Sequence, residues 1–251
     1  MASKPLNTLS QDECSDYYDI LVKNAKSQWD IADTLSAAGQ YGAATSHLLI
    51  SIEESMKSII VFMDTQGYTF RHIKGIDAIF RNHRIRFFIA YIMFAIGLIG
   101  EDFIKLLGKI KKNPGLADEY VKLFTGKEEM PLELKYYLLR KMILLKNEKE
   151  LFKKADLFRQ IGFYADYNAE AHSPQDMTQE TYNTIYERML KVKKFTASLI
   201  KAYSPSDETM KKLIANNKKI FNENKFYSLI ERGLLKAKNT KDSPFDLLND
   251  N

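Results

Sequence analysis

The chain has 251 residues, of which 45% are hydrophobic and 27% are charged, as in an ordinary globular protein that buries a full core. Its single cysteine, Cys14, excludes an internal disulfide and a cysteine-based metal cluster, and it fits a reducing compartment. The net charge of +5 permits contact with nucleic acid but does not demand it, because short lysine clusters interleaved with aliphatic residues are typical of solvated helix faces.

The sequence predicts an all-α fold. Glycine and proline are scarce, at 11 and 6 residues, and no run alternates between apolar and polar residues over the length of a strand. We expect helices over 11–38, 41–65, 76–80, a long apolar segment that ends near Lys112, 116–124, 132–145, 148–167, 178–203 and 206–237. Asn147 either joins two of these helices or lies inside one continuous helix.

The two ends of the chain are predicted to lack stable structure: residues 1–10 are expected to be disordered, and residues 238–251 to form a polar, frayed tail. The first residues lack the apolar stretch of a signal peptide. The longest uncharged apolar run, Phe87–Gly100, has about 14 residues, whereas a membrane span needs ~20. We therefore expect a buried central helix, no membrane span and a cytoplasmic location.

The expected helix over 41–65 carries charged residues in an unusual place. Leu49, Ile52 and Met56 recur at three- and four-residue steps and form an apolar face. Glu53 and Glu54 lie where this face meets a stripe of small and polar residues. A purely structural helix more often keeps an acidic pair on its solvated face, so the placement predicts a buried or half-buried polar site.

Two readings of this acidic pair remain open. Glu53 and Lys57 are four residues apart, in the order that favours an ion pair on the helix surface. Alternatively, Glu53 or Glu54 points inward and meets a cation from another helix, because a buried carboxylate must be paired. The candidate partners are Arg81, His83, Arg84 and Arg159.

A basic segment precedes the long apolar helix. Arg81, Arg84 and Arg86 surround His83, and arginine forks match the oxygens of a phosphate group. These three arginines are therefore candidates for contact with nucleic acid or phosphate. The alternative is a basic helix start that packs against acidic groups elsewhere in the fold.

A third segment combines Arg159, Gly162, Tyr164 and Asp166. Tyr164 and Asp166 are candidates for a hydrogen-bonded cluster with Arg159; the alternative is a helix end with an aromatic anchor. Gly162 inside a helix costs roughly 1 kcal/mol relative to alanine, and a close approach of another helix is one reason to keep it.

Familiar enzyme signatures are absent from the sequence. It has no glycine-rich phosphate loop, no HExxH, no nucleophile elbow and no zinc-ligand spacing. The four histidines, at 47, 72, 83 and 172, are scattered. We therefore expect neither a metal ion nor a cofactor.

Taken in order, these segments resemble the AbiV family of bacterial abortive-infection proteins, a branch of the HEPN superfamily. The resemblance spans about residues 35–173. It is carried by Gly39-x-Tyr41-x-x-Ala44 with Glu53-Glu54-x-x-Lys57, by Phe80-x-x-His83-x-x-Arg86, and by Arg159-x-x-Gly162-x-Tyr164-x-Asp166.

The resemblance implies a HEPN-type helical bundle over 11–203, with additional C-terminal helices, that often pairs into a homodimer and halts phage multiplication. Many HEPN relatives are metal-independent ribonucleases with an arginine followed four to six residues later by a histidine. Here Arg159 fits the arginine, and Tyr164 stands where the histidine is expected. His83 could approach from another helix.

Three hypotheses follow. The first is an antiphage protein that binds a phage protein or a host macromolecule, such as RNA or the translation apparatus, with Glu53, Glu54, Lys57 and Asp166 as an internal polar network. The second is a ribonuclease whose catalytic residues are Arg159, Tyr164 and His83. The third is a helical scaffold without catalysis.

Overall fold

The computed structural model describes residues 4–68, 70–112, 132–164, 166–168, 170–203 and Phe245. The expected all-α class is confirmed over these residues. The helices are α1 (Gln11–Ala37), α2 (Tyr41–Thr65), α3 (Asp77–Arg81), α4 (His83–Lys112), α6 (Leu132–Ile161) and α7 (Gln179–Ala202). Short 3-10 turns, η1 (Leu6–Thr8), η2 (Phe70–His72) and η3 (Pro174–Asp176), and a hairpin of β1 (Asp166–Asn168) and β2 (Glu170–His172) complete the described elements.

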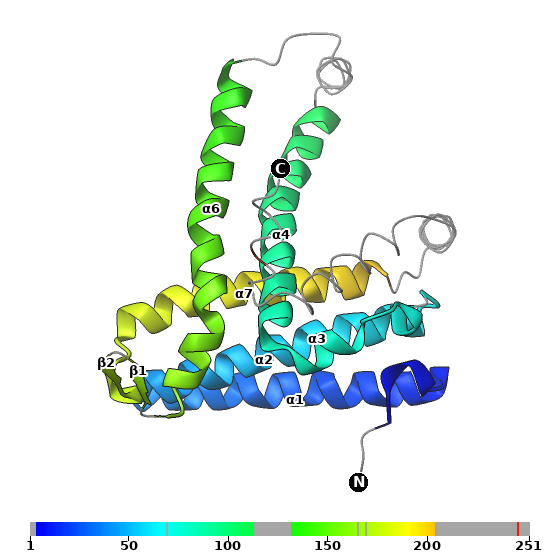
Figure 1. Ribbon diagram of the computed structural model, residues 1–251. Coiled ribbons are helices and arrows are strands. Elements are labelled where there is room, and N and C mark those ends of the chain that lie inside the picture. The colour runs from blue at the N-terminus through cyan, green and yellow to red at the C-terminus, as the bar shows by residue number, and fades with distance from the viewer. Residues whose placement is uncertain are drawn as a thin grey trace.

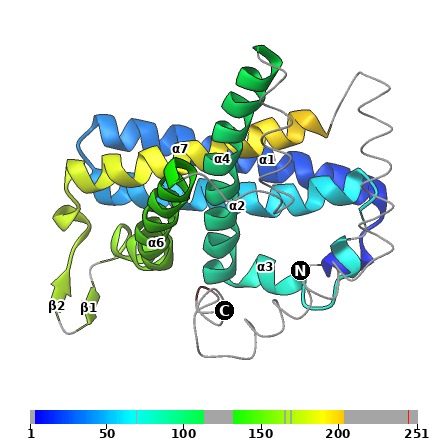
Figure 2. The same cartoon turned by 90° about the horizontal axis from the view of Figure 1, so that it is seen from above.

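Helix α2 is the centre of the fold. It pairs with α1 in a helical hairpin and also contacts α4, α6 and α7 (Figure 1). Helices α1, α2 and α7 form a layer, seen from above in Figure 2, and α4 and α6 rise steeply from it in Figure 1. The turn between α1 and α2 uses Gly39 at φ 76°, a left-handed conformation that glycine adopts without a steric penalty.

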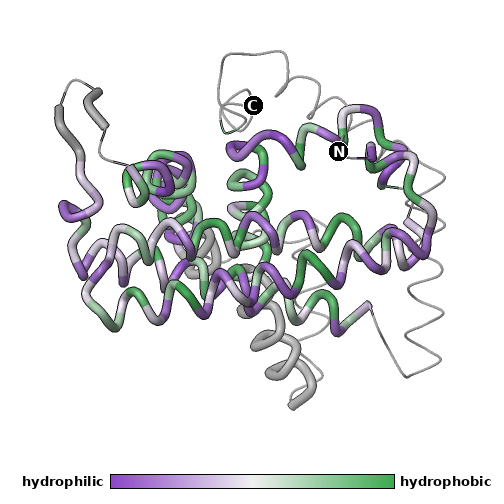
Figure 3. The backbone as a smooth tube through the Cα atoms, turned by 90° about the horizontal axis from the view of Figure 1, so that it is seen from below, coloured by the Kyte–Doolittle hydropathy of each residue, from purple (hydrophilic) through white to green (hydrophobic). Residues whose placement is uncertain are grey.

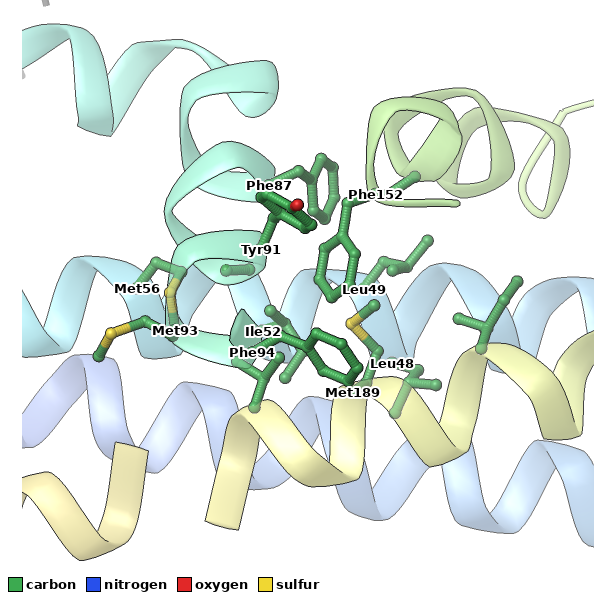
Figure 4. Close-up of a cluster of buried hydrophobic side chains, with 14 of the residues drawn as sticks. Leu48, Leu49, Ile52, Met56, Phe87, Tyr91, Met93, Phe94, Phe152 and Met189 are labelled. Atoms are coloured by element: carbon green, nitrogen blue, oxygen red, sulfur yellow. The ribbon is translucent and has the colours of Figure 1, made fainter. Parts of the chain in front are cut away.

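The main core lies where α2, α4, α6 and α7 meet (Figure 4). Along α1 and α2, hydrophilic and hydrophobic residues follow each other at short intervals, so that each turn contributes to an apolar face, as expected of amphipathic helices (Figure 3). After its polar first turn, α4 buries Phe87, Ala90, Tyr91, Met93 and Phe94, as expected from the Phe87–Gly100 run, whereas Ile96 is 48% exposed. The labelled core side chains are Leu48, Leu49, Ile52, Met56, Phe87, Tyr91, Met93, Phe94, Phe152 and Met189.

The structure corrects several expected boundaries. Asn147 lies inside one continuous helix, α6, which ends at Ile161 instead of Tyr167. The hairpin that follows was missed because strands of three residues are too short to show a two-residue period. The expected helices over 116–124 and 206–237 lie outside the described residues.

Both ends of the chain differ from the expected disorder where they are described. Residues 4–10 contain η1, Leu6 is buried, and Ser10 and Glu13 form a capping box at the start of α1. Near the other end, Phe245 is only 1% exposed, and its ring packs against Phe88 and Tyr91 of α4. In the part of the chain that the structure describes, no helix is long and apolar enough to cross a membrane.

Asp64, near the end of α2, is a buried carboxyl group whose pKa is shifted. Its Oδ2 accepts a hydrogen bond from the backbone N–H of Arg71 at 2.8 Å, and the Arg71 Nε lies 3.9 Å from Oδ1. Burial outweighs both interactions and raises the pKa of Asp64 from 3.8 to about 6. The folded chain therefore binds this proton more tightly than the unfolded chain does.

We expect Asp64→Asn to change how stability depends on pH. In the wild type, the contribution of Asp64 to the free energy of unfolding is complete below pH 3.8 and is lost as pH rises through 6, about 3 kcal/mol in all. The asparagine keeps an acceptor for the Arg71 N–H but does not titrate. Urea unfolding at pH 4 to 7 should show the variant more stable at pH 7 and the difference vanishing toward pH 4. A difference in the free energy of unfolding between variant and wild type that stays constant over this pH range would contradict the raised pKa of Asp64.

Candidate functional site

The site begins at Asn82, which separates α3 from α4. Its backbone is extended, at φ −110° and ψ 113°, so the chain turns there. Its side-chain oxygen accepts hydrogen bonds from the backbone N–H groups of Arg84 at 2.9 Å and Ile85 at 3.4 Å. This cap fixes the first turn of α4, in which His83 and Arg86 are three residues apart and therefore share one face.

Glu53 of α2 is the centre of a buried ionic cluster. It is 3% exposed, and side chains from two other helices, α4 and α6, contact its carboxylate. His83 Nδ1 lies 2.6 Å from Oε1, Arg86 Nη2 lies 3.1 Å from Oε2, and Arg159 Nε lies 3.6 Å from Oε1. We call Glu53, His83, Arg86 and Arg159 the Glu53 cluster. A carboxylate at this depth needs such partners because desolvation alone would cost several kcal/mol.

The contacts of His83 determine which ring nitrogen carries the proton. Nδ1 lies 2.6 Å from both Glu53 Oε1 and Arg86 Nη2, but a guanidinium only donates and a carboxylate only accepts. We assign the proton to Nδ1, which donates to Oε1, because an unprotonated Nδ1 would place two acceptors 2.6 Å apart in a buried site. The other ring nitrogen, Nε2, is then an acceptor on a side chain that is 40% exposed.

Arg86 lies in the interior instead of at the surface. Its side chain is 3% exposed, and Nη1 donates to the carbonyl oxygen of Ile79 in α3 at 2.9 Å. This position differs from the phosphate contact expected from the sequence. The reason is the spacing: a residue three positions after His83 faces α2 as His83 does, whereas Arg81 and Arg84 are exposed.

Arg159 joins the cluster from the last turns of α6. Its side chain is 16% exposed, and its Nε and Nη2 donate to Asp156 Oδ1 at 3.2 and 2.9 Å. The carbonyl oxygen of Arg159 accepts a hydrogen bond from the buried Ser46 hydroxyl at 2.6 Å. Arg159 is therefore held by α2 on its backbone side and by Asp156 and Glu53 on its guanidinium side.

Two neighbouring pockets open beside the cluster. The first, of 490 Å³, is lined by the α3–α4 junction, including Arg81, His83 and Arg84, and by Asp156 of α6. The second, of 310 Å³, shares Arg84 and Asp156 with the first and adds Lys153. We call the two together the α4 cleft. Its lining holds three cationic side chains, Arg81, Arg84 and Lys153, and two carboxylates, Asp77 and Asp156, and the half-exposed imidazole of His83 lines it beside buried Glu53.

Glu54 and Lys57 form a separate pair on α2. Glu54 is 9% exposed, and its Oε1 accepts a hydrogen bond from Lys57 Nζ at 2.5 Å. Burial and the charge of Glu54 together raise the pKa of the neighbouring Tyr17 hydroxyl. Both glutamates are thus buried, as their position on the apolar face predicted, and the lysine pairs with Glu54 instead of Glu53.

Tyr164 lies apart from the cluster. It follows the end of α6, is 67% exposed, and contacts the ring of Phe163 at a centroid distance of 6.2 Å. Asp166 begins β1, but its side chain lies outside the described residues. The structure thus brings Glu53, His83 and Arg159 together and leaves Tyr164 at the surface.

Sequence reasoning missed two members of the site. Asp156 was not considered, although it precedes Arg159 by three residues and so lies on the same helix face. Arg86 was not among the candidate partners of Glu53, but the alternative given for its segment, a basic helix start packed against acidic groups, holds for this residue. Among the described residues, no group of three or more histidine, cysteine, aspartate or glutamate side chains could hold a metal ion.

Fold and site together define an all-α bundle protein whose core holds a histidine–carboxylate–arginine cluster beside a cleft lined by charged side chains of both signs. The chain belongs to the AbiV family: the HEPN-type family model described as AbiV matches residues 13–194, more than half of the chain. This confirms the resemblance seen in the sequence, and it suggests an antiphage, abortive-infection role. No curated protein and no solved structure matches the chain.

Proposed function

We propose that this protein acts in the cytoplasm, as a homodimer, in abortive infection, and that it binds the phosphate backbone of RNA in the α4 cleft. The observation that supports this most is the exposed pair Arg81 and Arg84 beside His83, on the rim of a 490 Å³ pocket. Phosphate oxygens accept charge-assisted hydrogen bonds from guanidinium groups, often in two-point contacts.

The Glu53 cluster has a supporting part in this proposal. Glu53 fixes the imidazole ring of His83, which lines the cleft, through a contact of 2.6 Å to Nδ1. Arg86 donates one hydrogen bond to the same carboxylate and another to the carbonyl oxygen of Ile79 in α3, and so links α2 to α3. The cleft is therefore shaped before a ligand enters, and preorganisation of this kind reduces the entropic cost of binding.

We expect Arg81→Ala combined with Arg84→Ala to weaken RNA binding roughly tenfold or more, because each arginine neutralises a phosphate. The measurement is fluorescence anisotropy with a short labelled single-stranded RNA over a range of salt. The slope of log K against log salt should fall by about two units. In cells, the plating efficiency of phage should rise to that of cells without the protein.

The matched control is Lys194→Ala combined with Lys201→Ala, which removes the same charge from exposed positions on α7 that line neither pocket. This variant should bind RNA and protect cells nearly as the wild type does. Equal loss in both variants would indicate only a general charge effect. Loss of protection with RNA binding unchanged would overturn RNA as the ligand and point to a protein partner.

A second candidate function, metal-independent cleavage of RNA, is favoured by the His83–Glu53 contact of 2.6 Å. A carboxylate that holds one imidazole nitrogen leaves the other free to accept a proton from an attacking 2′-hydroxyl group. The guanidinium of Arg159 would stabilise the negative charge of the Glu53 carboxylate. Tyr164 has no place in this mechanism, because it is exposed and contacts Phe163 instead of the cluster.

We expect His83→Ala to abolish cleavage, if the wild type cleaves, while RNA binding changes less than threefold, since Arg81 and Arg84 remain. The assay incubates purified protein with RNA in EDTA and follows fragments on a gel. Fragments from the wild type that persist with His83→Ala would exclude His83 as the base. RNA left intact by the wild type would exclude the ribonuclease and leave the binding function.

A further inference from the structure

An exposed aromatic ring lies one helical turn beyond the α4 cleft. Lys153, Leu157 and Gln160 line the smaller pocket of this cleft from α6, and their four- and three-residue steps place them on one line along the helix. Tyr164 follows Gln160 by four residues, and its backbone N–H still donates to the Gln160 carbonyl oxygen at 3.0 Å. Tyr164 therefore continues this line past the end of α6, and it is 67% exposed.

The ring of Tyr164 is supported from two other helices. It contacts the ring of Phe163 at a centroid distance of 6.2 Å, and Phe163 in turn meets His47 of α2 edge to face at 5.1 Å. Nδ1 of His47 donates to the side-chain oxygen of Gln28 in α1 at 2.6 Å, since an amide oxygen only accepts. Burial lowers the pKa of His47, so its ring is neutral at pH 7. Tyr164 is thus positioned before a ligand arrives, which reduces the entropic cost of binding.

The smaller pocket of the cleft, next to this ring, favours an anion. Its charged side chains are Arg84, Lys153 and Asp156. Asp156 is already held by other side chains: Oδ1 accepts a hydrogen bond from Arg159 Nη2 at 2.9 Å, and Oδ2 accepts one from Gln160 Nε2 at 3.3 Å. Two cations thus line the pocket with one carboxylate whose charge Arg159 compensates, and a phosphate group is complementary to them.

We infer that Tyr164 stacks on an unpaired base of the RNA strand whose phosphate lies in the α4 cleft. The helical rise places Tyr164 ~6 Å beyond Gln160 along α6, comparable to the spacing of neighbouring nucleotides in an extended strand. A tyrosine ring accepts any base, because every base has a π-face. In a duplex the bases are stacked on one another, so this ring selects single-stranded RNA. The inference rests on the proposed function and deepens it.

The test compares Tyr164→Ala with Tyr164→Phe in the full chain. Fluorescence anisotropy with a short labelled oligoadenylate should show Tyr164→Ala binding at least roughly fivefold more weakly than the wild type, because one base loses its stacking partner. The slope of log K against log salt should stay unchanged, since no charge is removed. Tyr164→Phe keeps the ring and should bind within roughly twofold of the wild type. The same strand annealed to its complement should bind the wild type and Tyr164→Ala equally.

Tyr136→Ala is the matched control. It removes the same side chain from an exposed position of the same helix, 58% exposed, that lines neither pocket of the cleft. This variant should bind the oligoadenylate as the wild type does. Thermal unfolding followed by circular dichroism should be the same for Tyr164→Ala and the wild type, because the ring is mostly in solvent, and this separates lost stacking from a damaged fold.

The contrary outcomes differ for the inference and for the proposed function. A wild type that binds no RNA overturns both. A wild type that binds the oligoadenylate as tightly as Tyr164→Ala does overturns the stacking alone and leaves phosphate binding in the α4 cleft. Equal losses in Tyr164→Ala and Tyr164→Phe would assign the contact to the hydroxyl group instead of the ring. Loss of phage protection in Tyr164→Ala with unchanged RNA affinity would show that Tyr164 contacts a protein partner.

Discussion

Glu53→Ala is expected to destabilise the protein by about 3 to 5 kcal/mol, because it leaves the guanidinium of Arg86 buried without a counter-charge. Arg86 is 2% exposed and its Nε lacks a hydrogen-bond partner among the described residues, so water compensates its charge poorly once Glu53 is gone. For a chain of this length the melting temperature should fall by roughly 10 °C. Thermal unfolding followed by circular dichroism measures this.

The double variant Glu53→Leu with Arg86→Met tests the cause. If the single variant suffers from an unpaired buried charge, removal of both charges should recover most of the loss. Glu150→Ala, at an exposed position of α6, is the matched control and should shift stability by less than about 0.5 kcal/mol. A loss below 1 kcal/mol in Glu53→Ala would mean that Arg86 finds water or another acceptor.

The fold was largely predictable because its helices are long and strongly periodic. Helix α1 starts after its capping residue, Ser10. Helices α1 and α2 end at Gly39 and Gly67, which adopt positive φ. The end of α6 and the β1–β2 hairpin were not predictable in this way. The end of α6 depends on a contact with α2 that is distant in sequence, and the strands of the hairpin are too short to show a two-residue period.

The candidate site was predictable only in part. The burial of Glu53 and its pairing with a cation from another helix follow from its position on an apolar face. Which cation it meets depends on how α4 and α6 cross α2: of the four predicted candidates, His83 and Arg159 contact Glu53, whereas Arg81 and Arg84 are exposed. Arg86 and Arg84 differ by two positions, and that difference decides which one is buried and which one lines the cleft.

Gly162→Ala is the second substitution with a large expected effect, because the end of α6 meets the start of α2 without room for a side chain. A Cβ at Gly162 would lie 2.1 Å from the Ser46 hydroxyl and 2.2 Å from the carbonyl oxygen of Gly42. Gly42 cannot retreat, since its own Cβ position lies 2.2 Å from the carbonyl oxygen of Pro174. The close approach of another helix that Gly162 suggested in the sequence is thus present, and the helix is α2.

We expect Gly162→Ala to cost about 3 kcal/mol, because the backbones of α2 and α6 must separate. Gly39→Ala is the matched control: it adds the same methyl group at φ 76° with nothing within 4 Å, and it should cost about 1 kcal/mol of backbone strain. Urea unfolding measures both. Because Ser46 holds the Arg159 carbonyl at this crossing, Gly162→Ala should also displace Arg159 from Glu53. Adding Ser46→Ala should not restore stability, since the Gly42 carbonyl still blocks the methyl group; full recovery would show that the hydroxyl alone sets the spacing.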